Sequence, residues 1–166
     1  MADYEKAFQR LMKDEGFVLT DAAGDHGGQT YAGITRKNHP SWTGWRWVDA
    51  GDTPPTDLVR ELYATEYWAQ VRGNDISSQR VAEVLFGQHV NMGATAIKLA
   101  QTVAGVIADG KVGPKTVAAI NAMNEEYFLA CYALANVARY HAIGMKDKTQ
   151  RKWWPGWLGR ALRIVV

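Results

Sequence analysis

The chain has 166 residues, which is enough for one compact domain with a sizeable core. Hydrophobic residues make up 47% of it and charged residues 22%, as in ordinary soluble globular proteins, so composition excludes a disordered or fibrous chain. The formal net charge of +2 gives no reason to expect nucleic-acid binding. The single cysteine, Cys131, excludes an intramolecular disulfide and a cysteine metal cluster.

The first segment predicts a helix with one apolar face. Its apolar residues recur at the helical spacing i, i+3, i+4, i+7 and i+8, and they are Tyr4, Ala7, Phe8, Leu11 and Met12. Glu15 is the next position on the same stripe, and Gly16 is expected to stop the helix.

Residues 17–52 are rich in Gly, Asp and Thr, which predicts loops and a small hairpin. Helices are expected again from the start signal at residues 53–57. Later helices are indicated by apolar spacing around Val81 and Ile97, by Gly113-Pro114, and by the run from Phe128. The predicted fold class is therefore mainly α (α+β), a helical bundle with a small irregular or β element near the N-terminus.

Glu15 and the loop after it could carry acid–base chemistry. Cleavage of a glycosidic bond needs a carboxylic acid whose pKa is raised by apolar surroundings, and a second carboxylate. Asp21 and Asp25 lie within loop reach of Glu15, and Thr30 could orient a carboxylate or a water. The alternative is that Glu15 merely ends a helix and that the aspartates form turns.

Several motifs resemble a known family. They are Glu15-Gly16-Phe17, the run Gly24 to Ile34, the Trp-rich run Pro40 to Trp45, the run from Phe86 to Gly93, and Asp109 to Thr116. Together they resemble the glycoside hydrolase 108 family of phage and bacterial N-acetylmuramidases. The resemblance implies a lysozyme-like fold, hydrolysis of the β-1,4 MurNAc–GlcNAc bond of peptidoglycan, and Glu15 as the catalytic glutamate.

The chain departs from the family at one point, because the family has two glycines after this glutamate and here Gly16 stands alone before Phe17. The single glycine also resembles small phage lysozymes, in which a Glu, an Asp and a Thr form the site. On that pattern Asp25 and Thr30 are the partners of Glu15. The second half resembles a peptidoglycan-binding helical module. We therefore expect one lysozyme-like domain over 1–166, with the catalytic and cleft region in 1–75 and the peptidoglycan-binding-like half in 76–166.

The predicted substrate-binding residues are His26, Tyr31 and Asn91. Asn91 could instead cap the following helix, and His26 could simply be solvated. One of Trp42, Trp45 and Trp47 could stack on a sugar. Neither a metal nor a cofactor is expected, since the remaining histidines lack ligand-like spacing.

The C-terminal segment 146–166, called the tail below, carries six basic residues and one acidic residue, for a net charge of +5. The rest of the chain carries −3. Trp157, Ala161 and Ile164 predict a short helix with an apolar side, starting after Pro155 and Gly156. This helix could dock on the catalytic body, which we favour, or lie on anionic lipid of the envelope.

The expected partner is bacterial peptidoglycan, with envelope contact through the tail, no nucleic acid, and a monomeric state. No apolar run near the start is long enough for a signal peptide or membrane span. We therefore expect synthesis in the host cytoplasm and action on the wall, in the periplasm, after release by another factor. The alternative function is a non-catalytic peptidoglycan-binding protein of the same fold.

Overall fold

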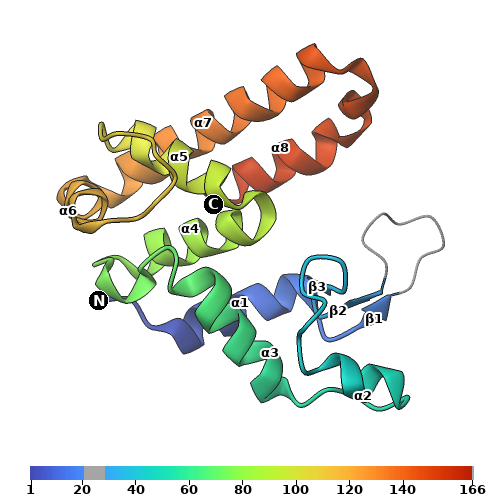
Figure 1. Cartoon of the computed structure of the whole chain (residues 1–166). Coiled ribbons are helices and arrows are strands. Elements are labelled where there is room, and N and C mark those ends of the chain that lie inside the picture. Colours follow the sequence, from blue (N-terminus) through green and yellow to red (C-terminus); the bar gives the residue numbers. More distant parts are fainter. Residues whose placement is uncertain (21–28, 166) are drawn as a thin grey trace. The chain divides into compact units, whose positions relative to one another are not determined.

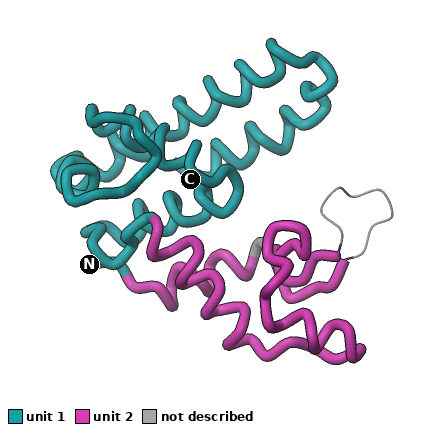
Figure 2. The backbone as a smooth tube through the Cα atoms, in the orientation of Figure 1, with its two compact units in different colours: residues 1–2, 71–166 teal, residues 3–70 magenta. Residues whose placement is uncertain are grey.

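The computed structural model describes residues 1–20 and 29–165, and only the backbone of Asp14 and Glu15. The described residues form eight α-helices and a small three-stranded antiparallel sheet near the N-terminus (Figure 1). This confirms the predicted fold class, mainly helical with a small β element. The chain divides into two compact units. Residues 3–70, magenta and keyed as unit 2 in Figure 2, are called the first unit below because they come first in the chain. Residues 1–2 with 71–166, teal and keyed as unit 1, are called the second unit.

Helix α1, Tyr4–Glu15, opens the first unit and ends where the sequence predicts. The Asp3 side chain caps it by accepting a hydrogen bond from the Lys6 amide at 3.1 Å. Gly16 leaves the helix with a φ of +68°, a conformation that glycine adopts at little cost. The predicted apolar face is buried at Ala7, Phe8, Leu11 and Met12.

The sheet consists of β1 Leu19–Thr20, β2 Thr30–Tyr31 and β3 Ile34–Thr35, paired in that order. Ala32 and Gly33 join β2 to β3 with φ angles of +49° and +76°, as a tight hairpin turn requires. The buried Tyr63 hydroxyl donates to the Ala32 carbonyl at 2.9 Å and fixes this turn. The expected hairpin is confirmed.

A short helix, α2 Trp45–Asp49, lies in the region expected to hold only loops and a hairpin. The expectation was wrong here because five residues are too few to show a helical period. Local contacts hold this turn: Arg36 lies over the Trp45 ring at 4.7 Å and donates to the Asp49 carboxylate at 2.6 Å.

Helix α3, Thr56–Tyr63, continues directly into the π-helical turn η1, Ala64–Trp68. Aromatic contacts bind α1 to this pair, because the Tyr4 ring lies 5.6 Å from Trp68 and Phe8 lies 6.2 Å from Tyr63. The Tyr4 hydroxyl also donates to the Arg60 carbonyl at 2.6 Å. These contacts fix the path of α1 and so the backbone position of Glu15.

The second unit contains the remaining helices. They are η2 Gly73–Asp75, α4 Gln79–Met92, α5 Ala94–Val103, α6 Pro114–Ala122, α7 Glu125–Lys146, η3 Lys148–Trp153 and α8 Trp154–Leu162. The four helices predicted between residues 79 and 146 are confirmed. The Tyr132 hydroxyl, fully buried, donates to the Ala96 carbonyl at 3.0 Å and links α7 to α5.

The tail folds back along α7, so that α8 lies against it (Figure 1). The Trp157 ring stacks on Tyr140 with centroids 5.3 Å apart, and Trp154 donates its indole N–H to the Tyr140 carbonyl at 3.2 Å. The tail therefore docks within the chain, but on α7 of the second unit and not on the catalytic region that we expected to receive it. The helix begins at Trp154 rather than after Pro155 and Gly156, because proline is tolerated in a first helical turn.

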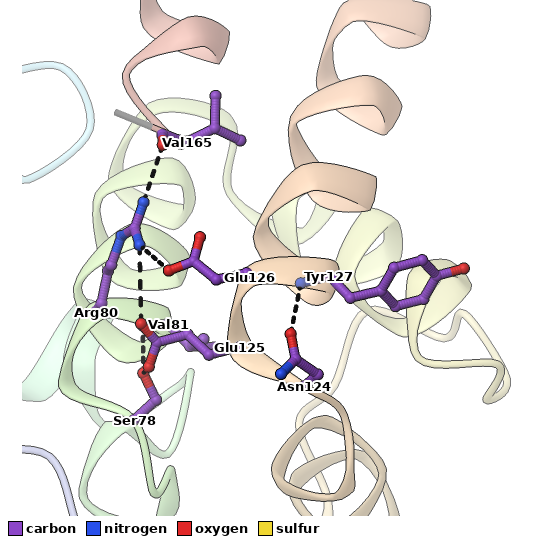
Figure 3. A network of polar contacts seen from close by, with 8 residues as sticks. All are labelled: Ser78, Arg80, Val81, Asn124, Glu125, Glu126, Tyr127 and Val165. Carbon is purple, nitrogen blue, oxygen red and sulfur yellow. Dashed lines mark hydrogen bonds and ion pairs between the residues drawn. The ribbon is translucent and has the colours of Figure 1, made fainter.

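Arg80 ties the end of the tail to two helices (Figure 3). Its guanidinium donates to the Val165 carbonyl at 3.0 Å and pairs with the Glu126 carboxylate at 2.6 Å. Glu125 accepts a hydrogen bond from Ser78, the residue that caps α4, at 2.6 Å. One cluster thus joins the starts of α4 and α7 to the end of the chain. No helix among the described residues is long and apolar enough to cross a membrane.

Candidate functional site

Glu15 is the last residue of α1, directly before the turn at Gly16 that leads to the sheet. The Glu15 backbone therefore lies at the junction between α1 and the segment that leads to the sheet. The predicted acid role needs this kind of position, with a rigid helix behind the residue and a loop in front of it. The role itself stays a prediction.

Thr30 and Tyr31 are neighbours on β2, where Thr30 pairs in register with Thr20 and Thr35. Thr30 is half-buried, whereas Tyr31 is only 4% exposed. Burial raises the pKa of the Tyr31 hydroxyl, which therefore stays protonated at neutral pH. The two predicted residues are consecutive on one strand, so their side chains point to opposite faces of the sheet.

The predicted second carboxylate, Asp25, and the predicted sugar contact, His26, lie outside the described residues, as does Asp21. Their roles remain predictions from the sequence.

Asn91 lies near the end of α4 in the second unit, exposed to solvent. The alternative capping role is wrong, because its side-chain amide donates back to the Gly87 carbonyl of its own helix at 2.8 Å. Gly93, with a φ of +55°, occupies the cap position of α5 instead. The predicted contact of Asn91 with substrate is compatible with its exposure and stays a prediction.

Among the three tryptophans singled out from the sequence, Trp42 contacts the predicted site residue Tyr31. Its ring stacks on Tyr31 with centroids 6.2 Å apart and meets Trp45 edge-on at 5.1 Å. Its indole N–H donates to the Leu58 carbonyl at 3.3 Å. The ring also covers Gly44, where an added Cβ would lie 2.3 Å from it. Trp42 is thus fixed between β2, α2 and α3.

Trp42 also lines a pocket of about 460 Å³ in the first unit that the sequence did not reveal. The pocket lies between the segment 38–43 and one side of α3 and η1. Its other lining residues are Leu58, Glu61, Leu62, Thr65 and Glu66. The Trp-rich run Pro40 to Trp45, noted in the sequence analysis, was the one sequence feature that pointed to this pocket. The opposite wall is formed by residues 58–66 of α3 and η1, and the sequence did not predict that they face this run.

The pocket lining combines an aromatic ring with carboxylates, hydroxyls and a histidine. Glu61 and Glu66 are both exposed, and the His39 ring nitrogen Nε2 lies 2.9 Å from the Tyr67 hydroxyl. Burial, with the nearby Glu66 charge, raises the pKa of Tyr67, so this hydroxyl stays neutral. Such a lining offers hydrogen bonds to a polar ligand.

In the second unit, the Asp109 to Thr116 run is organised around a buried amide. Gln101, 1% exposed, donates through Nε2 to the Asp109 carboxylate, the Lys111 carbonyl and the Thr116 hydroxyl, at 2.8, 3.0 and 3.2 Å. Its oxygen accepts the Gly110 amide at 2.8 Å. These bonds explain the motif as a structural connection between α5 and α6.

In the part of the chain that the structure describes, no three His, Cys, Asp or Glu side chains gather in a way that could hold a metal ion.

Comparison with known proteins bears directly on this arrangement. A model of the glycosyl hydrolase 108 family matches residues 8–93, which is more than half of the chain and includes α1 from Phe8 onward, the sheet and the pocket. The chain belongs to the glycosyl hydrolase 108 family. Since this is a family of glycoside hydrolases, the expected resemblance is confirmed.

The second half matches a different model, described as a predicted peptidoglycan domain, over residues 95–162. The structure of SagA from Brucella abortus is similar over 98% of this chain and 91% of that chain, with 27% identity and a TM-score of 0.77. The lysozyme-like architecture is thereby confirmed, and peptidoglycan is the general target of the two matched families. No curated protein matches the chain.

Proposed function

We propose that this glycosyl hydrolase 108 protein cleaves the β-1,4 MurNAc–GlcNAc bond of peptidoglycan, with Glu15 as general acid. The observation that carries the proposal is the backbone position of Glu15, at the end of α1 and immediately before the Gly16 turn into the sheet. The family match spans this junction. Ala7, Phe8, Leu11 and Met12 precede Glu15 on the predicted stripe and are buried. An acid that follows the same stripe would be favoured in its protonated form.

Asp25 is proposed as the second carboxylate and Thr30 as its partner or as the holder of a water. Stacking of Tyr31 on the Trp42 ring supports β2, the strand that carries Thr30. His26 and Asn91 are proposed to contact the glycan. The protein would act on the wall as a monomer.

A second candidate function, wall binding without hydrolysis, is favoured by one observation, namely the match of residues 95–162 to a peptidoglycan domain. The two functions are not exclusive. A chain that only binds, however, has no use for a carboxylate on the apolar stripe of α1, which favours the hydrolase.

The substitution Glu15→Gln separates the two functions. A general acid contributes roughly 10²–10⁴ in rate, and an amide cannot donate the proton, so clearing of a suspension of permeabilised cells should slow by that factor. Glu5→Gln is the matched control on the same helix, because Glu5 forms an exposed ion pair with Arg60 at 3.1 Å that contributes little. Both variants should melt close to the native protein.

A folded Glu15→Gln variant that clears cells at the native rate would exclude the acid role. Retained binding to isolated wall sacculi with lost clearing is the expected pattern. A native protein that binds sacculi but never clears them would establish the wall-binding alternative.

A further inference from the structure

Helix α8 carries two apolar stripes, and docking on α7 uses only one of them. The docked stripe contains Ala161 and Ile164, which are 1% and 2% exposed, together with Trp157 stacked on Tyr140. The other, called the outer stripe, consists of Leu158, Leu162 and Val165, which are 39%, 61% and 39% exposed. Packing within the chain thus leaves the outer stripe uncovered.

The residues of the outer stripe follow one another at i, i+4 and i+7, so they lie along one side of the helix and its final turn. Trp153, 54% exposed, stands just before the helix begins. Single exposed apolar side chains are common on protein surfaces, but a continuous apolar row beside an exposed tryptophan marks an interaction surface.

The tail that carries the outer stripe is cationic. Lys146, Lys148, Lys152 and Arg163 are exposed. No described carboxylate lies within 4.0 Å of any basic side chain of the tail. The one tail acid, Asp147, accepts hydrogen bonds from Thr149 at 2.9 and 2.7 Å. These four exposed cations therefore have no described carboxylate close enough to neutralise them.

We propose that the outer stripe and its lysines dock the protein on an anionic lipid surface. A lipid layer of this kind offers both an apolar interior for leucine and valine side chains and negative headgroups for the cations. A glycan strand offers no aliphatic interior, and nucleic acid makes no use of an aliphatic row. A second copy of the chain would bring a second charge of +5 against the first, which repels.

The docked stripe gives this surface its stability. Because Trp154 and Trp157 are held on α7 and Arg80 holds the Val165 carbonyl, α8 is already a helix before it meets a membrane. A preformed helix has no folding cost to meet on binding. Its depth is limited to the headgroup region, since one side of the helix stays on α7.

The test is co-sedimentation of the full-length protein with vesicles. Equimolar phosphatidylglycerol and phosphatidylcholine vesicles should bind the protein at low salt, at least about tenfold more strongly than pure phosphatidylcholine. Ionic strength of about 1 M, where the screening length falls to about 3 Å, should abolish most of the difference. The assay contains no peptidoglycan, so its outcome is independent of the proposed hydrolase function.

Two sets of variants separate the apolar and cationic contributions. Leu158→Gln with Leu162→Gln should reduce binding to anionic vesicles at least about tenfold, and Lys148→Glu with Lys152→Glu should reduce it similarly. Leu134→Gln is the matched control, because Leu134 is 69% exposed on α7 and outside the outer stripe, and it should bind like the native protein.

Thermal melting shows that each variant is folded before its binding is read. Folded leucine variants that bind as the native protein does would overturn the proposal, as would equal binding to neutral and anionic vesicles. Absence of vesicle binding combined with concentration-dependent dimers in solution would replace the lipid by a second copy of the chain.

Discussion

Asp25 and Asp21 are the two carboxylates close enough along the chain to work with Glu15. Asp25 stands nearer to Thr30 and to the Gly27-Gly28 pair, where a sugar could approach the backbone closely. We therefore expect Asp25→Asn to lower kcat on peptidoglycan more than Asp21→Asn does. Matched kinetics of the two folded variants test this expectation, and equal or reversed losses would reassign the second carboxylate.

Asp109 gives a prediction for pH. Its hydrogen bond from Gln101, followed by that from the Lys111 amide, lowers the pKa of its carboxyl below the ordinary value of 3.8. A carboxyl with a lowered pKa in the folded state stabilises the protein above pH 3.8, and this stabilisation is lost as the pH falls through the folded-state pKa.

The Asp109→Asn variant isolates this effect from all other carboxylates. Its melting temperature should lie below that of the native protein at pH 5–7, and the two should converge as the pH falls through the lowered pKa of Asp109 in the folded state. A difference in melting temperature that stays constant at every pH would mean that the Asp109 charge does not contribute to stability and that the substitution acts through altered packing or hydrogen bonding.

Single residues were predictable from sequence only where a local rule governs them. Gly16 was expected to end a helix and does so, because a positive φ after an apolar stripe is a local requirement. The pocket beside Trp42 could not be predicted, since it depends on α3 lying against a segment about twenty residues earlier in the chain. The side chain of Asn91 could bond either the start of the following helix, as a cap, or the Gly87 carbonyl of its own helix. Sequence spacing alone does not decide between these two partners.

At the scale of elements, the contact between α7 and α8 depends on one glycine. A Cβ added at Gly144 would lie 2.5 Å from three atoms of the Trp154 ring, far inside normal contact distance. Gly144→Ala should therefore push Trp154 off α7, break its hydrogen bond to Tyr140, and cost about 1–3 kcal/mol of stability.

Gly159→Ala is the matched control in α8, because nothing lies within 4 Å of its Cβ position. Alanine should be neutral or stabilise that helix by about 0.5–1 kcal/mol. Urea unfolding of both variants checks the pair. An unchanged midpoint for Gly144→Ala would show that the tail is not held by this contact.

Helices with an apolar period or a clear start signal were predictable, and α2 was not. Periodicity identifies α1, α4, α5 and α7, whereas the start of α6 was indicated by Gly113-Pro114. Helix α2 has five residues and is set by Arg36 and aromatic packing from elsewhere in its unit. The start of α8 was placed too late because Pro155 was read as a boundary, whereas it occupies the first turn.

At the scale of the molecule, the division into residues 3–70 and 71–166 parallels the two family matches, 8–93 and 95–162, without coinciding with their boundary. The first unit holds the end of α1 and the sheet, and the second holds the peptidoglycan-domain match and the tail. Composition could exclude whole classes of protein, but it could not divide the chain, since no linker-like stretch separates the halves.

The proposal that Glu15 drives cleavage between MurNAc and GlcNAc is tested most directly by mass spectrometry of the products from purified wall sacculi. Hydrolysis at the proposed bond adds water and leaves a reducing MurNAc end, which borohydride converts to muramitol. The native protein should yield such fragments, and Glu15→Gln should yield almost none. Fragments that end in reduced GlcNAc, that end in anhydro-MurNAc lacking one water, or that form equally with folded Glu15→Gln would contradict the account.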